Sequence, residues 1–258
     1  MKNITSVLSE KGGVGKTTTT YLLSQALSKD HKVLMIDMDG QKSNLTSVFS
    51  SALPGGYEDH TIYEVLTERN DIKESIYSVH ENLNLIPATY SMSSLPRTKI
   101  SVFKKAIQEV RDDYDYIFLD SSPSPTWSQV LQLSISDFLL LPLNPETSNL
   151  LAVSAVYESV EEIQMSMNPN LQIIGLVFNQ YDGRTNMAKQ VSSTVQKMAE
   201  TMHTSVFGQT IRRSVTIPEA IFACQSLENY KPSAPVTKDV HAFVKEFQSR
   251  VEEANHGK

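Results

Sequence analysis

The sequence predicts one doubly wound α/β domain that spans residues 1–258, with a mostly parallel sheet of about seven or eight strands flanked by helices. Short apolar runs that end in polar or acidic residues recur between helical patterns, as buried parallel strands do. A glycine-rich loop joins the first run to an amphipathic stretch, which reads as strand, loop and helix. With 40% hydrophobic and 20% charged residues, the composition is that of an ordinary soluble protein.

The glycine-rich loop follows an apolar run, Ile4 to Leu8, and precedes a helical stretch, Thr20 to Leu27. Three glycines in four positions let successive backbone N–H groups point inward and form a cradle for phosphate. Lys16 would reach the β- and γ-phosphates, Thr17 would bind a bridging Mg²⁺ ion, and Thr18 would donate to the α-phosphate. The alternative is a glycine-rich turn with an exposed lysine. The candidate binding residues are Lys11, Gly12, Gly13, Val14, Gly15, Lys16, Thr17 and Thr18.

The loop departs from the general P-loop pattern, because Glu10 stands where the first glycine is expected and a second lysine, Lys11, follows it. Lys-Gly-Gly-Val-Gly-Lys-Thr-Thr resembles the deviant Walker A motif of the ParA/MinD family of ATPases. That resemblance implies that Lys11 crosses a dimer interface to the partner's phosphates and, with Lys16, takes part in catalysis. The alternative for Lys11 is a solvated loop lysine.

A second buried strand, Lys32 to Ile36, ends in Asp37-Met38-Asp39-Gly40-Gln41. This order resembles the family's Asp-x-Asp-Pro-Gln motif, which implies that Asp39 positions or activates the attacking water and that both carboxylates belong to the magnesium shell. Two carboxylates near Mg²⁺ and a γ-phosphate suit that chemistry. A strand-end turn is the alternative. Gly40 stands where proline is common, so we expect a looser loop.

A third apolar run, Tyr116 to Asp120, has the Walker B form and is followed by Ser121-Ser122-Pro123-Ser124-Pro125. Asp120 would hold a magnesium water beside Thr17. Ser122 replaces the first proline of the family's usual Asp-x-Pro-Pro. The alternative is a structural aspartate at a strand end.

The rest of the chain completes the predicted α/β pattern. Polar residues 42–60 suggest a mobile connection. Short helices are expected at 61–66 and 71–76, longer helices at 95–111, 147–165 and from 236 onward, and further strands at 83–87, 137–142 and 171–178.

Asn179 follows the last predicted strand, and the relatives' asparagine in this setting pairs with adenine; an ordinary strand-end asparagine is the alternative. The segment from Tyr181 to Asn186 resembles one found in small ParA proteins, whose arginine is linked to non-specific DNA binding. Between residues 182 and 213 the basic residues Arg184, Lys189, Lys197, Arg212 and Arg213 exceed the acidic residues Asp182 and Glu200, although the net charge of the chain is −6. The DNA-binding candidates are Arg184, Lys189, Arg212 and Arg213.

The chain contains a single cysteine, Cys224, and we expect it to be a small buried residue in a protein of a reducing cytoplasm. The cysteine count also disfavours a metal-cluster ATPase such as the nitrogenase iron protein. No apolar run approaches a membrane span, and the first predicted strand begins within a few residues of Met1, so we expect no signal peptide. The tail after residue 251 is acidic, which disfavours a MinD-like membrane helix.

The resemblance implies an ATP- and Mg²⁺-dependent ATPase that partitions DNA, most simply plasmids. Two protomers would enclose two ATP molecules, bind non-specific DNA on the nucleoid in that state, and separate after hydrolysis stimulated by a centromere-binding, ParB-type partner. A MinD-like membrane-associated positioning ATPase and a metabolic or metal-cluster ATPase of the same superfamily remain alternatives.

Overall fold

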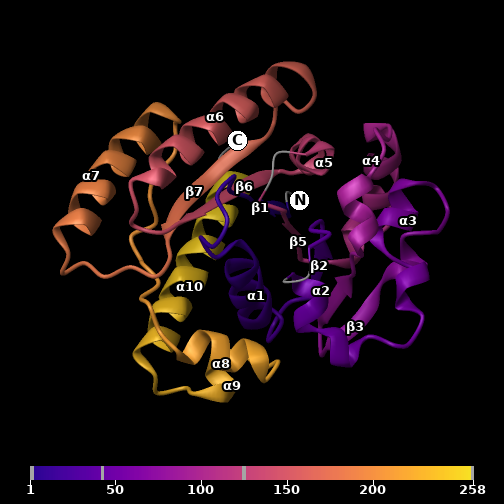
Figure 1. Ribbon diagram of the computed structural model, residues 1–258, viewed down its shortest axis with the longest axis horizontal. Coiled ribbons are helices and arrows are strands. Elements are labelled where there is room, and N and C mark those ends of the chain that lie inside the picture. The colour runs from indigo at the N-terminus through magenta and orange to yellow at the C-terminus, as the bar shows by residue number, and fades with distance from the viewer. Residues whose placement is uncertain (1–2, 42–43, 124–125, 257–258) are drawn as a thin grey trace.

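The computed structural model describes residues 3–41, 44–123 and 126–256. The parts of the predictions that fall on residues 1–2, on 42–43 of the connection 42–60, on Ser124 and Pro125, and on Gly257 and Lys258 lie outside the described residues. Within the described ranges, seven strands form one sheet in the order β3-β4-β2-β5-β1-β6-β7 (Figure 1). All neighbouring strands are parallel except β3 and β4. The strands are β1 Ile4–Val7, β2 Val33–Asp37, β3 Tyr77–His80, β4 Leu83–Ile86, β5 Tyr116–Asp120, β6 Phe138–Leu143 and β7 Gln172–Phe178.

Helices cover both faces of the sheet (Figure 1). The α-helices are α1 Lys16–Leu27, α2 Leu45–Val48, α3 Ile62–Leu66, α4 Ile100–Gln108, α5 Trp127–Ile135, α6 Ser148–Ser166, α7 Asn186–Thr201, α8 Thr216–Phe222, α9 Leu227–Tyr230 and α10 Pro235–His256. Short 3₁₀ turns lie at η1 Ser50–Ala52, η2 Tyr57–Asp59, η3 Lys73–Ser75, η4 Tyr90–Ser94 and η5 Arg111–Asp113. The predicted doubly wound α/β architecture is confirmed.

The central strand β5 shows why the strands read as continuous apolar runs. Tyr116 and Phe118 point into the core between the sheet and helices α1 and α10, whereas Ile117 and Leu119 point into the core on the opposite face. Because both faces of a doubly wound sheet are covered, alternate side chains are all buried and the sequence loses its polar alternation.

Helix α10 packs its apolar stripe against the sheet and α1. The stripe predicted from the sequence is buried in full: Val240, Phe243, Val244, Phe247 and Val251. Each fills the core that also contains the α1 residues Tyr21, Leu23 and Leu27. This surface is therefore used for packing within the protein, and no described helix is long and apolar enough to span a bilayer.

The guanidinium of Arg250 links α10 by hydrogen bonds to the edge strand β7 and to the segment beside it. It donates to the carbonyl oxygens of Ile174 at 3.0 Å and Val206 at 3.0 Å, and it lies 3.8 Å above the ring centroid of Phe207. Gly175, with φ +155°, lies beneath this stack, where a Cβ atom would collide with Phe207. Arg250 thus orders the chain that runs alongside β7.

Three local predictions differ from the structure. Residues 44–60 are not a mobile connection: α2, η1 and η2 form there, and Leu45 and Phe49 are buried in the core. Strand β3 was missed because it is only four residues long and mostly outside the core, so its alternation of apolar and polar residues, Tyr77–His80, is too short to be distinctive. The helix expected from residue 95 begins only at Ile100, after Pro96.

We predict that Arg250→Ala lowers the free energy of unfolding by about 2–4 kcal/mol, because it removes charge-assisted hydrogen bonds and a cation–π contact and leaves carbonyl groups without donors. Urea unfolding followed by circular dichroism measures the change. The control is Lys245→Ala on the exposed side of α10, which should change stability by less than about 0.5 kcal/mol. Equal stability of the two variants would contradict the prediction.

Candidate functional site: a phosphate-binding loop at the carboxyl edge of the sheet

The glycine-rich loop leaves β1 and enters α1 through two residues with left-handed backbone, Gly13 at φ +77° and Gly15 at φ +93°. A Cβ atom at Gly15 would come within 2.7 Å of the Asn179 amide nitrogen. Both the backbone conformation and the close approach therefore require glycine at position 15. The loop ends at the N-terminus of α1, where free N–H groups favour an anion.

The two lysines of the loop lie differently. Lys16 is buried, and its ammonium donates to the Lys11 carbonyl oxygen at 3.3 Å, so the Lys16 side chain folds back over the loop. The Lys11 side chain leaves the loop and donates to the Glu146 carboxylate and, at 2.6 Å, to the Ser148 hydroxyl at the start of α6. The hydrogen bond from Lys11 holds the pKa of the exposed Glu146 carboxyl below its usual range. Lys11 therefore contacts its own chain outside the phosphate cradle.

Asp120 ends β5 and joins the Walker B strand to the P-loop helix. Its carboxylate accepts hydrogen bonds from Thr17 Oγ1 at 2.7 Å and Thr20 Oγ1 at 3.2 Å, and it has no solvent exposure. In the register of β2 with β5, Asp37 is the residue paired with Asp120. The sheet thus brings residues from three distant parts of the sequence to one edge, as predicted.

Asp39 follows β2 and is held by its neighbours. Its backbone N–H donates to Asp37 Oδ1 at 2.9 Å, and its carboxylate accepts from the Gln41 N–H at 3.0 Å. Gly40 lies against η4, where an added Cβ atom would be only 3.0 Å from Met92 Cβ. We expected a looser loop without proline, but close packing against η4 constrains it instead.

Burial dominates the electrostatics of these acids. It raises the pKa of Asp120 to about 8 and that of Asp37 to about 7, and each site feels the charge of a neighbouring aspartate. Burial also raises the pKa of Asp39, which the nearby Lys16 ammonium opposes. Desolvation lowers the pKa of Lys16, against the attraction of Asp120 and Asp39. The site therefore concentrates acidic groups that a cation would stabilise in the ionised form.

The donor set fits a magnesium ion bound together with phosphate. Among the described residues, no group of three or more His, Cys, Asp or Glu side chains could hold a metal by itself. Mg²⁺ with a nucleotide normally takes only one or two protein oxygens and completes its shell with phosphate and water. The Thr17 hydroxyl and the Asp120 carboxylate provide such oxygens. Asp37 is less suited to bind metal directly, because it accepts three protein hydrogen bonds, two of them at Oδ2, whereas Asp120 accepts one at each oxygen.

Asn179 borders a second part of the site, a cavity of about 590 Å³ between the P-loop and the segment that leads into α8. Its amide nitrogen donates to the Val14 carbonyl at 3.0 Å and to Thr19 Oγ1 at 2.9 Å. Its amide oxygen is buried and has no hydrogen-bond partner among the described residues. Thr18, Ile211 and Ile217 also line the cavity. A mostly apolar cavity with such an amide oxygen at its border suits a purine base. The isoleucines of this wall were not predicted as site residues, because nothing in their sequence distinguishes them from core residues.

The predicted DNA-binding residues are exposed, and three of them lie on adjacent segments. Tyr181, which starts the loop of Arg184, forms a parallel bridge with Arg212. Arg184 pairs in a bidentate manner with Asp182, which lowers the pKa of that carboxyl to about 2. Arg212 pairs with Asp239 of α10. The other two candidates, Lys189 on α7 and Arg213, are exposed as well.

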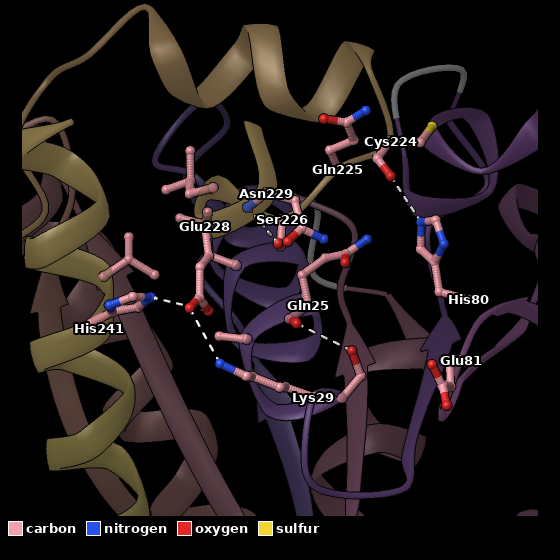
Figure 2. A pocket seen from close by; sticks show the side chains of 15 residues that line it. Gln25, Lys29, His80, Glu81, Cys224, Gln225, Ser226, Glu228, Asn229 and His241 are labelled. Atoms are coloured by element: carbon pink, nitrogen blue, oxygen red, sulfur yellow. Dashed lines mark hydrogen bonds and ion pairs between the residues drawn. The ribbon is translucent and has the colours of Figure 1, made fainter. Parts of the chain in front are cut away.

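Another cavity, of about 430 Å³, lies at the opposite end of α1 (Figure 2). Glu228 there pairs with Lys29 at 3.2 Å and with His241 at 3.7 Å, so one carboxylate joins α9 to α1 and α10. Cys224 is half-buried rather than buried, and its thiol donates to the Val48 carbonyl at 3.0 Å. None of the predicted phosphate-binding residues lines this cavity.

Comparison with known proteins identifies the family. A family model described as an AAA domain matches residues 1–173. The sporulation initiation inhibitor protein Soj of Bacillus subtilis is 32% identical over 85% of this chain and 88% of its own length. The virulence plasmid ParA family protein pGP5-D of Chlamydia psittaci is 28% identical over 93% of this chain and 92% of its own length. The chain belongs to the ParA family.

A solved structure agrees with this ParA-family assignment. A plasmid partition protein from Borrelia burgdorferi B31, determined with bound AMPPNP, superposes with a TM-score of 0.79 and 27% identity over 97% of this chain and all of that one. As a ParA-family member, the chain is an ATPase of the partition or positioning type.

The raised pKa values predict that, without divalent cations, this ParA-family protein loses stability as the pH rises from about 4 through about 8. Asp37 and Asp120 bind protons more tightly in the folded state than in the unfolded state, so folding loses this advantage as they ionise. In Asp120→Asn, the fall in unfolding free energy between about pH 5 and pH 8.5 should be smaller by more than about 1 kcal/mol. Urea unfolding at both pH values measures it, with Asp59→Asn, an exposed site, as control. If the free energy of unfolding fell as much in Asp120→Asn as in the wild type, the raised pKa of Asp120 would be contradicted.

Proposed function

We propose that the protein is a Mg²⁺-dependent ATPase that partitions DNA, most simply plasmids, through an ATP-bound homodimer. The observation that carries the proposal is the convergence of Lys16, Thr17, Asp39 and Asp120 around one phosphate cradle. Two relatives support plasmid DNA as the cargo, because the name of each refers to a plasmid. We treat residues 1–258 as one domain.

In the proposed reaction, each residue has a separate task. Lys16 and the loop N–H groups stabilise charge on the phosphates, and Thr17 and Asp120 hold the cation that neutralises it. Asp39 orients a water molecule for attack on the γ-phosphate and is close enough to Lys16 for their charges to interact. Asn179 and the adjoining cavity receive the adenine. ATP and water thus yield ADP and phosphate.

The dimer is proposed from the position of Lys11. Because the Lys11 ammonium points away from its own phosphate cradle, it is available to a neighbouring one once it leaves Glu146 and Ser148. Two such lysines would neutralise charge across the interface. A ParB-type, centromere-binding partner that stimulates hydrolysis completes the proposed cycle and returns the protein from the nucleoid to the cytoplasm.

DNA binding is proposed for the exposed basic residues Arg184, Lys189 and Arg213, with Arg212 restrained by Asp239. The burial of the α10 stripe speaks against a MinD-like membrane helix, because that stripe already packs within the protein. The single cysteine speaks against a cluster-binding relative.

We expect Asp39→Ala to bind ATP but to hydrolyse it at least a hundredfold more slowly, because the attacking water loses its carboxylate. The variant should accumulate as an ATP-bound dimer in size-exclusion chromatography, while phosphate release is followed in parallel. Asp59→Ala, at an exposed aspartate of η2, is the control and should retain wild-type turnover. Wild-type turnover of Asp39→Ala would remove Asp39 from the mechanism.

We expect the wild type to bind a non-specific DNA duplex with Mg-ATP and not with Mg-ADP, at equal moderate salt. Arg184→Ala should weaken this binding about tenfold and reduce the slope of log K against log salt by about 2 per dimer, without changing ATP affinity. The matched variant Asp182→Asn removes the carboxylate that pairs with Arg184, so it should bind DNA at least as tightly as the wild type. A DNA affinity that does not change with salt concentration, or that is unchanged in Arg184→Ala, would contradict the proposed role of Arg184 in DNA binding.

A further inference from the structure

A chain of buried hydrogen bonds fixes the loop that carries Asp39. Asp37 Oδ1 accepts from the Asp39 N–H at 2.9 Å, and Asp37 Oδ2 accepts from both the N–H of Thr46, at 2.8 Å, and its hydroxyl, at 2.6 Å. All three residues are buried, with Asp37 at 0% exposure. In such surroundings, hydrogen bonds to a carboxylate are strong, and their removal leaves a polar group without a partner.

The Thr46 hydroxyl also reaches the neighbouring strand. Its oxygen accepts from the Ala88 N–H at 2.8 Å, just beyond the end of β4. Because the hydroxyl has one proton, which it donates to Asp37, its orientation is fixed by these two contacts. Thr46 therefore links the ends of β2 and β4 through a single side chain and sets the position of Asp37.

The other side of Asp39 is held as well. The Asn44 amide nitrogen donates to the Asp39 carbonyl at 2.6 Å, and Gly40 packs against η4 with no space for a side chain. The peptide groups on both sides of Asp39 are thus held in place, and none of the hydrogen bonds that hold them involves the P-loop or Asp120. These contacts fix the backbone position from which the Asp39 side chain extends.

We infer that Thr46 is a positioning residue for ATP hydrolysis. It holds Asp37, Asp37 holds the backbone of Asp39, and the carboxylate that orients the attacking water is placed by this chain. The inference rests on the role of Asp39 in the proposed function. Since the two hydroxyl contacts of Thr46 go to Asp37 and Ala88, its loss affects the rate of hydrolysis and leaves ATP binding in place.

The test is Thr46→Val, which keeps the shape of the side chain and the backbone N–H but replaces the hydroxyl with a methyl group. We expect kcat to fall about tenfold to a hundredfold, the range for a small misplacement of a catalytic group, with Kd for a non-hydrolysable ATP analogue within about threefold of the wild type. Thr46→Ser restores the hydroxyl and should restore kcat. If the valine variant does not fold, Thr46→Ala against Thr46→Ser provides the same comparison.

Val48→Ala is the matched control for general loosening of α2. The Val48 side chain is partly buried against the core that contains Leu45 and Phe49, and an apolar side chain makes no hydrogen bond to Asp37 or Asn44. Its truncation should leave kcat near the wild-type value. A wild-type kcat in Thr46→Val, or an equal loss in Val48→Ala, would overturn the inference. Turnover by Asp39→Ala would instead overturn the proposed role of Asp39, so the two failures are distinguishable.

Discussion

Asp120 is a carboxylate with no solvent exposure, and such a group is stable only where donors or cations reach it. Two hydroxyls of α1 provide the donors, and they fix the start of that helix beside the end of β5. The same contact positions Lys16 and the glycine-rich loop. The parallel register then brings Asp37 opposite Asp120, so the acids of two strands and the phosphate cradle share one edge of the sheet. The site depends on this one buried group and its partners.

Much of this arrangement could be predicted from the sequence. Strands buried on both faces are nearly continuous apolar runs, and β2 and β5 end in aspartates that must meet at the carboxyl edge. The glycines of the loop leave little choice of local structure. The P-loop, the two acidic strand ends and the apolar stripe of α10 were therefore all identifiable before the structure.

Other features depend on contacts between distant residues and left no local pattern. Nothing in the sequence indicates that Thr46 joins Asp37 to Ala88, because a threonine in a polar stretch has many ordinary roles. The fixed Gly40 could not be predicted either, since η4, which constrains it, lies some fifty residues away in the sequence. The basic residues near Arg184 and Arg212 could be counted from the sequence. The count could not show that Arg184 pairs with Asp182 and Arg212 with Asp239.

The bridge between Tyr181 and Arg212 has a mechanical consequence. The segment that carries Arg212 and Arg213 also forms one wall of the cavity beside the P-loop, and the bridge ties it to the loop of Arg184. A base that enters the cavity and a phosphate that meets the arginines would therefore push on the same short length of backbone. If the protein binds DNA as proposed, communication between the nucleotide and the nucleic acid would need no relay through the body of the protein, because Arg212 and Arg213 themselves line the cavity.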